Sequence, residues 1–150
     1  RWAPSAAHWR ILAETEAVLR GKGHALAAEA RLELAHALAQ ARRTPAQREQ
    51  FALALSRGFA LQQRALESHG KGDLREAVRL LREALAVYKP VLGESHPVSA
   101  HALDNLGIAL QDLGEHKAAL AALRQALAAR RADFGDNHPI CARSLNSLAR

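Results

Sequence analysis

The chain has 150 residues, of which 49% are hydrophobic and 24% charged, and its formal net charge is +6 at pH 7. That length suits one ordinary domain, and a single cysteine, Cys141, excludes an internal disulfide. No apolar run reaches the roughly 20 residues that a membrane-spanning helix needs. Leu and Ala dominate the apolar residues, while β-branched and aromatic residues are scarce, so we expect an all-α protein.

Apolar stretches separated by Gly and Pro predict about seven helices. Their expected ranges are 5–20, 24–42, 46–69, 73–90, 97–112, 115–133 and 139–150. Thr44 and Pro45 are typical of a helix start, since a capping residue is followed by proline at the first helical position. The helix that follows is long, and Gly58 is the position where we expect a bend.

A six-residue signature occurs twice, as LGESHP at 92–97 and as FGDNHP at 134–139, a shift of 42 residues. In each copy the glycine is suited to end one helix and the proline to begin the next. Residues on both sides match at the same shift: Gly72 with Gly114, Ala77 with Ala119, Leu81 with Leu123, Ala84 with Ala126, Leu103 with Leu145, and Leu106 with Leu148. A fixed period of this length predicts a solenoid of antiparallel helical hairpins.

We interpret the chain as one helical-repeat domain, 1–150. Within it we expect a degenerate N-terminal hairpin at 1–43, a first repeat with a long first helix at 44–96, a second repeat at 97–138, and the first helix of a truncated third repeat at 139–150. The N-terminal assignment depends on the tripeptide GKG, which occurs at 21–23 and again at 70–72. Because the chain begins with Arg1 and contains no methionine, we expect it to be a piece of a longer protein.

The pattern from Ala100 to Ala126 resembles the tetratricopeptide repeat. The residues at its signature positions are Leu103, Leu106, Gly107, Leu110, Ala119, Leu123 and Ala126. The 42-residue period, the LDNLG stretch and the Gly…His-Pro loop are more particularly similar to the kinesin light chain type of this repeat. The resemblance is good for 73–150, partial for 56–72 and poor before residue 44. It implies a right-handed superhelical solenoid whose first helices line a concave groove for a peptide or partner segment.

Carried over by position, the resemblance implies thirteen groove-facing residues. They are His101, Asp104, Asn105, Ile108, Gln111 and Asp112 in the second repeat, Arg143, Asn146 and Ser147 in the third, and Phe59, Gln62, Gln63 and Leu66 in the first. Carboxamides suit this role, because each one both donates and accepts hydrogen bonds and can hold a peptide backbone. Asn105 and Asn146 are therefore the leading candidates, although Asn105 would also serve simply to solvate its own helix.

Catalytic, metal and nucleotide sites are not expected, and neither is a cofactor. The chain has eight histidines, but no two of them lie three or four residues apart on one helix with a third ligand nearby. The GKG tripeptides lack the remaining residues of a phosphate-binding loop. Cys141 lies near an expected helix start, yet no histidine can be assigned to it as a catalytic partner.

The sequence thus predicts a non-catalytic protein-interaction scaffold, whose ligand is an extended segment of acidic character because the chain is basic. One alternative is self-association, through the open C-terminal hairpin face or through Trp2 and Trp9, which would otherwise cover the end of the array. A more distant alternative is nucleic-acid binding along the stripe of Arg75, Arg79 and Arg82, for which a solvated helix face is the favoured interpretation. We expect a cytoplasmic location, with a removed signal peptide as the alternative.

Overall fold

The computed structural model describes residues 10–11, 14 and 25–148 except residue 137. Within 25–148 the chain forms six helices and no strand: α2 (Ala25–Arg42), α3 (Pro45–Gly70), α4 (Leu74–Leu92), α5 (Pro97–Asp112), α6 (His116–Phe134) and α7 (Pro139–Leu148). The all-α prediction is confirmed. The helix predicted at 5–20 lies largely outside the described residues, as do the tripeptide at 21–23 and both Trp2 and Trp9.

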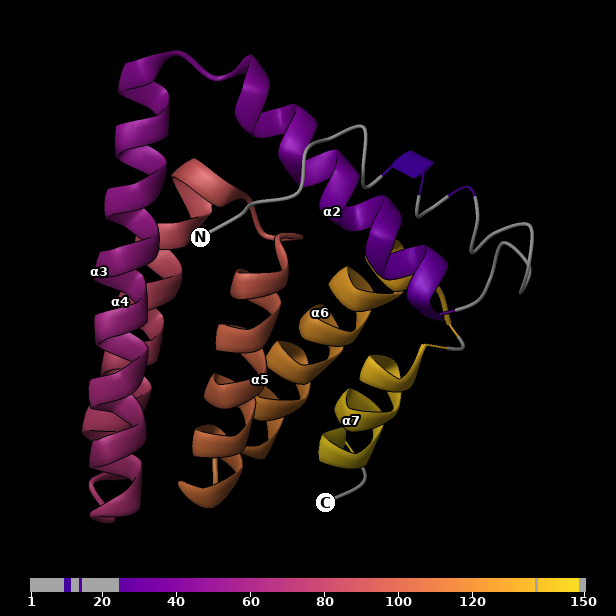
Figure 1. The fold of residues 1–150 in the computed structure, drawn as a ribbon. Coiled ribbons are helices and arrows are strands. Elements are labelled where there is room, and N and C mark those ends of the chain that lie inside the picture. Colours follow the sequence, from indigo (N-terminus) through magenta and orange to yellow (C-terminus); the bar gives the residue numbers. More distant parts are fainter. Residues whose placement is uncertain (1–9, 12–13, 15–24, 137, 149–150) are drawn as a thin grey trace.

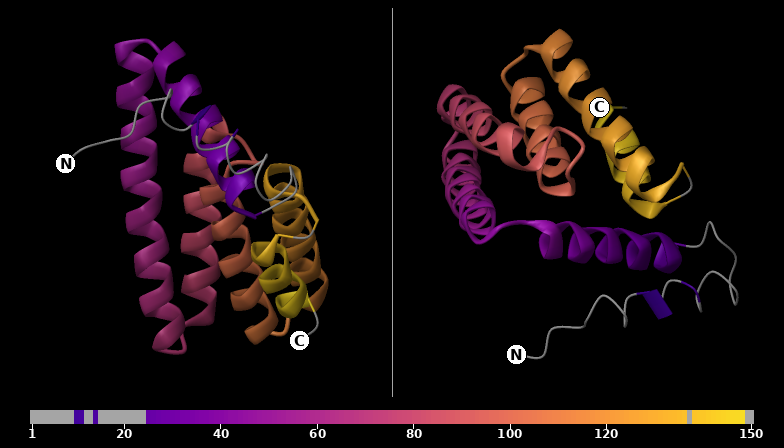
Figure 2. Two further views of the ribbon diagram at one scale, coloured as in Figure 1. Left: turned by 45° about the vertical axis from the view of Figure 1, so that its right-hand side comes forward. Right: turned by 90° about the horizontal axis from the view of Figure 1, so that it is seen from above.

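Helices α3 to α7 follow one another side by side in an arc (Figure 1), which is seen from above in Figure 2. α3 with α4, and α5 with α6, form antiparallel hairpins, and α7 packs against α6. This is the layout of a helical-repeat solenoid. α2 lies outside this row of helices. It precedes the start of α3 in the chain, and it crosses the array to contact α6.

Local capping chemistry sets the helix ends. Thr44 accepts a hydrogen bond from the backbone N–H of Gln47, whose side chain accepts one from the N–H of Thr44, so α3 begins with a capping box. α5 begins at Pro97, and His96 caps it. Gly93 and Gly135 follow α4 and α6 with φ of 85° each, a region that favours glycine. The predicted alternation of helix-ending glycine and helix-starting proline is confirmed.

Small residues let the helices approach closely, while leucines and one tyrosine fill the space between them. A Cβ on Gly107 would lie 2.5 Å from Cγ of Leu123, so α5 and α6 cross closely at this glycine. Gly58 has a comparable role, because a Cβ there would overlap the buried ring of Tyr88. α3 continues unbroken through Gly58, which therefore makes room for an aromatic ring and does not interrupt the helix. None of the described helices combines the length and apolar content required to cross a membrane.

Candidate functional site

Two adjoining depressions lie between α3 and α5, and together they form what we call the α3–α5 groove. The first has a volume of about 300 Å³ and is lined by Phe59, Gln62, Gln63, Leu66, Pro97, Val98 and His101. The second has a volume of about 90 Å³ and is lined by Ala65, Leu66, His69, Leu81, Asn105, Ile108 and Ala109. Because both include Leu66, the depressions form one continuous surface along the two helices.

The groove brings together seven of the thirteen residues that the sequence indicated, namely Phe59, Gln62, Gln63, Leu66, His101, Asn105 and Ile108. Phe59 is 59% exposed and Leu66 is 47% exposed. They lie seven residues apart on α3, which is two helical turns, so they share one face. Large apolar side chains this open to solvent, side by side, are typical of an interaction surface.

The side-chain amides of the groove differ in whether they have hydrogen-bond partners. Gln62 is buried, its Nε2 donates to the Tyr88 hydroxyl at 2.8 Å, and its Oε1 lies 3.3 Å from Nδ1 of His101. Burial raises the pKa of the Tyr88 phenol, so the hydroxyl stays neutral and can accept this bond. Nδ2 of Asn105, by contrast, is buried and has no hydrogen-bond partner. An unpaired buried donor is rare in folded proteins and requires an explanation.

Asp104 does not face the groove, and its assignment to the groove was wrong. It is 1% exposed, forms an ion pair with Arg130 of α6, and lies 3.5 Å from the Ser144 hydroxyl of α7. Arg130 also donates to that hydroxyl, so three helices meet at one buried polar cluster. Asp104 therefore joins neighbouring hairpins, because its position on α5 points toward α6 and α7.

Four further predicted residues, Gln111, Asp112, Asn146 and Ser147, do not line the α3–α5 groove. Nε2 of Gln111 donates to the Ser147 carbonyl at 2.9 Å, which links α5 to α7. Asp112 lies 2.7 Å from Nε2 of His69 at the far end of α3. Asn146 is exposed on α7, and the side chain of Arg143 lies outside the described part of the chain.

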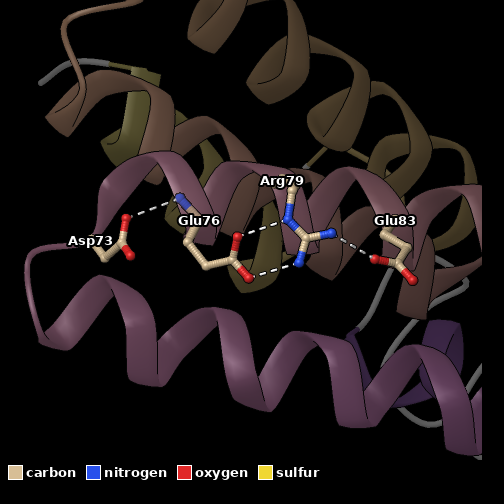
Figure 3. Close-up of polar contacts among 4 residues, drawn as sticks. All are labelled: Asp73, Glu76, Arg79 and Glu83. Carbon is tan, nitrogen blue, oxygen red and sulfur yellow. Dashed lines mark hydrogen bonds and ion pairs between the residues drawn. The ribbon is translucent and has the colours of Figure 1, made fainter.

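Arginines of the predicted basic stripe on α4 are engaged with acidic neighbours. Arg79 donates two hydrogen bonds to Glu76, each 2.7 Å, and one to Glu83 at 3.2 Å (Figure 3). These bonds hold the pKa of Glu76 below its ordinary value. Arg82 lies 3.8 Å from Glu115 of α6. Two of the three arginines of the stripe are thus engaged in charge pairs on a solvated helix face, which does not favour a nucleic-acid track.

Sequence reasoning missed six lining residues of the groove, namely Ala65, His69, Leu81, Pro97, Val98 and Ala109. It also singled out a cysteine that the structure buries. Pro97, Val98 and His69 line the groove because of where α5 starts and α3 ends, which helix periodicity alone does not reveal. Cys141 is buried and its thiol donates to the Gly135 carbonyl at 3.4 Å. Burial raises the pKa of this thiol, which disfavours the reactive thiolate. No cluster of three His, Cys, Asp or Glu residues in the described regions is placed to hold a metal ion.

Residues 60–132 match the family model described as the tetratricopeptide repeat. No match was found among curated proteins. The matched segment includes the groove-lining residues of α3 except Phe59, all of α4 and α5, and most of α6. Repeats of this family generally mediate protein–protein interactions and generally lack catalytic activity. The hairpin geometry and the family match agree, because both indicate an arrangement similar to the tetratricopeptide repeat over residues 60–132.

Proposed function

We propose that this chain is a non-catalytic interaction module that holds a segment of a partner protein in the α3–α5 groove. The observation that carries this proposal is the unpaired Nδ2 of Asn105 in the same groove as the exposed side chains of Phe59 and Leu66. The groove therefore offers apolar anchoring sites and a free hydrogen-bond donor at once. This combination suits a peptide, which has both side chains and backbone carbonyls.

The energetics favour occupancy of the groove. Fully burying an aromatic or leucine side chain contributes about 1.5–3 kcal/mol, so partial burial of Phe59 and Leu66 by a ligand supplies part of that range for each. A buried donor without a partner costs about 1–3 kcal/mol, and a ligand carbonyl at Nδ2 of Asn105 would remove this cost. Both terms favour the bound state over the empty one.

The ligand class follows from charge and repeat type. With a net charge of +6, the chain attracts segments whose apolar anchors are flanked by acidic residues, since such complementarity speeds association. The 42-residue period and the Gly…His-Pro loops support the kinesin light chain-like subtype of the repeat. An acidic, extended protein segment is thus the proposed ligand.

A phage-displayed library of random peptides, selected on the whole chain, tests the proposal. Selected peptides should carry apolar anchors with acidic neighbours. Asn105→Ala and Leu66→Ala should each weaken their binding about 10-fold, as expected when a central contact is lost. Asn146→Ala is the matched control, because Asn146 is exposed outside the groove, and it should bind like the wild type. If all three variants bound the selected peptides as tightly as the wild type does, the binding surface would lie elsewhere.

Self-association is the second candidate, and it rests on apolar side chains around α7. Leu145 is 45% exposed on α7 and Leu120 is 38% exposed on α6. Leu120 also lines a depression of about 220 Å³ that includes Gln111 and Leu148. Light scattering of the whole chain separates the candidates: a dimer that Leu145→Asp dissociates supports assembly through this face, and a monomer at all concentrations rejects it.

A further inference from the structure

α2 lies across one edge of the array, which we call the loop edge and define as residues 93–98 and 135–140. Both views in Figure 2 show α2 running from α3 toward α6 and α7. A cavity of about 720 Å³ separates α2 from the loop edge. Its polar lining includes Glu29, Glu33 and His36 from α2, and His96 and His138 from the loop edge. Three of the eight histidines of the chain thus lie in one seam.

The contacts of α2 repeat with the period of the array. The rings of His36 and His96 are stacked, with centroids 5.0 Å apart. Oε1 of Glu29 lies 3.4 Å from Nε2 of His138. Glu29 and His36 are seven residues apart, a rise of about 10 Å along a helix. His96 and His138 are one repeat apart, and packed helices are spaced by about 8–10 Å. α2 therefore contacts two successive copies of the same loop in register.

The capping role of His96 opposes its protonation. Nδ1 of His96 accepts the backbone N–H of Val98 at 3.2 Å, so the neutral ring carries its proton on Nε2. His138 makes the same bond to the N–H of Ile140 at 3.2 Å. A second proton on either ring would have to occupy Nδ1 and would break the cap. The capping geometry is thus repeated in both copies of the loop.

The surroundings of His96 also disfavour its protonated form. Burial lowers its pKa to about 4, with further contributions from His36 and from Arg43 at the end of α2. Because the pKa is below the ordinary value of 6.5, the docked arrangement is fully stabilised above about pH 6.5. This stabilisation is lost as the pH falls toward 4. At pH 5, a pKa of about 4 for His96 in the docked state and of 6.5 in the released state lowers the equilibrium constant for docking of α2 by at most about 30-fold.

Other charges in the seam modify this effect. Protonated His138 would be attracted to Glu29, which opposes release, but Glu29 is half exposed and the pair is screened by water. Asp133 of α6 is close enough to His36 for their charges to interact, and burial raises the pKa of its carboxyl, which weakens its attraction for a protonated ring. Glu33 also lines the cavity and is exposed to solvent. The half-buried His96 therefore dominates the response.

We propose that α2 is a pH-released latch, which closes on the loop edge while His96 is neutral and leaves it when acid protonates His96. The cavity under α2 shares Pro97 and Val98 with the α3–α5 groove, so the closed latch covers the loop end of the groove. Release at low pH would extend the surface open to a partner. This last consequence rests on the proposed function, whereas the latch itself does not.

Hydrogen exchange of the whole chain, measured by mass spectrometry at pH 7.5 and pH 5.0, tests the latch without any ligand. A released α2 is a single helix of 18 residues, which is marginally stable alone and exchanges quickly. After correction for intrinsic exchange rates, exchange in α2 should rise at pH 5.0, by at most about 30-fold. Exchange in α5 and α6 should stay constant, because their core lies outside the seam.

His96→Asn separates the latch from a general acid effect. Asparagine keeps an oxygen that caps α5 but cannot take up a proton, so α2 should exchange equally at both pH values. The matched control His116→Asn removes an exposed histidine outside the seam and should retain the wild-type response. If His96→Asn loses helicity by circular dichroism, His36→Asn replaces it and should reduce the response. The proposal is overturned if the pH response of α2 persists after the seam histidine has been replaced. It is also overturned if the wild type shows no pH response. Failure of peptide binding would leave this result unchanged.

Discussion

Replacing Gly107 by alanine tests whether close helix crossing holds the repeat together. The added Cβ would lie 2.5 Å from Cγ and 2.6 Å from Cδ2 of Leu123, and 3.4 Å from the Ala119 carbonyl oxygen. Leu123 is 0% exposed, and the clash reaches its branching carbon Cγ, so a turn of the terminal methyl groups alone does not relieve it. Such overpacking costs about 1–3 kcal/mol. Alanine recovers about 1 kcal/mol of helix propensity, so we expect a net loss of up to about 2 kcal/mol.

Urea unfolding followed by circular dichroism measures this loss as a lower midpoint with an unchanged slope. Gly70→Ala is the matched control, because a Cβ at Gly70 would meet no atom within 4 Å. That variant should be as stable as the wild type or slightly more stable. In the Gly107→Ala background, Leu123→Ala should cost less than it does in the wild type, since it removes the clash. A Gly107→Ala protein as stable as the wild type would refute the close-crossing argument.

Two further substitutions test the polar contacts, using the same unfolding assay. Asp104→Ala leaves Arg130 buried without its partner, and we expect a loss of about 3–5 kcal/mol. The double variant Asp104→Leu with Arg130→Met should recover most of it, and no recovery would mean that the pair is essential as such. Asp73→Ala removes the hydrogen bond that caps α4 at the N–H of Glu76, 3.2 Å long in Figure 3, and should cost about 1 kcal/mol. Glu115, 42 residues later, makes no capping bond, so Glu115→Ala should cost less; equal losses would contradict the capping argument.

The positions of α3 to α7 could be predicted because their ends are determined locally. Pro45, Pro97 and Pro139 each occupy the first position of a helix, and the predicted starts of α5 and α7 are those observed. The Gly107 crossing could also be predicted, because the small residue and its leucine partner both belong to a repeated pattern. Features that depend on neighbours in sequence are therefore visible without a structure.

Features that depend on distant residues were not visible. The resemblance placed Asp104 in the groove by its position in the repeat, and nothing near it in sequence marks Arg130 as its partner. The groove residues on α3 and α5 were identified by the resemblance, but the unpaired state of Asn105 depends on how the two helices pack. The path of α2 was missed for the same reason, since its contacts are with loops at least 60 residues away.

The glycine turns that connect successive helices, which we call joints, have a consequence for how such a chain can change its length. Gly72 and Gly114 have φ of 84° and 86°, and Gly93 and Gly135 have φ of 85° each. Each repeating unit thus brings its own two joints, with nearly the same backbone conformation in every copy. A genetic duplication or deletion of one whole unit would leave these joints intact on both sides. The array can therefore lengthen by complete repeating units, whereas an insertion of a few residues would shift every later helix out of register with the repeat.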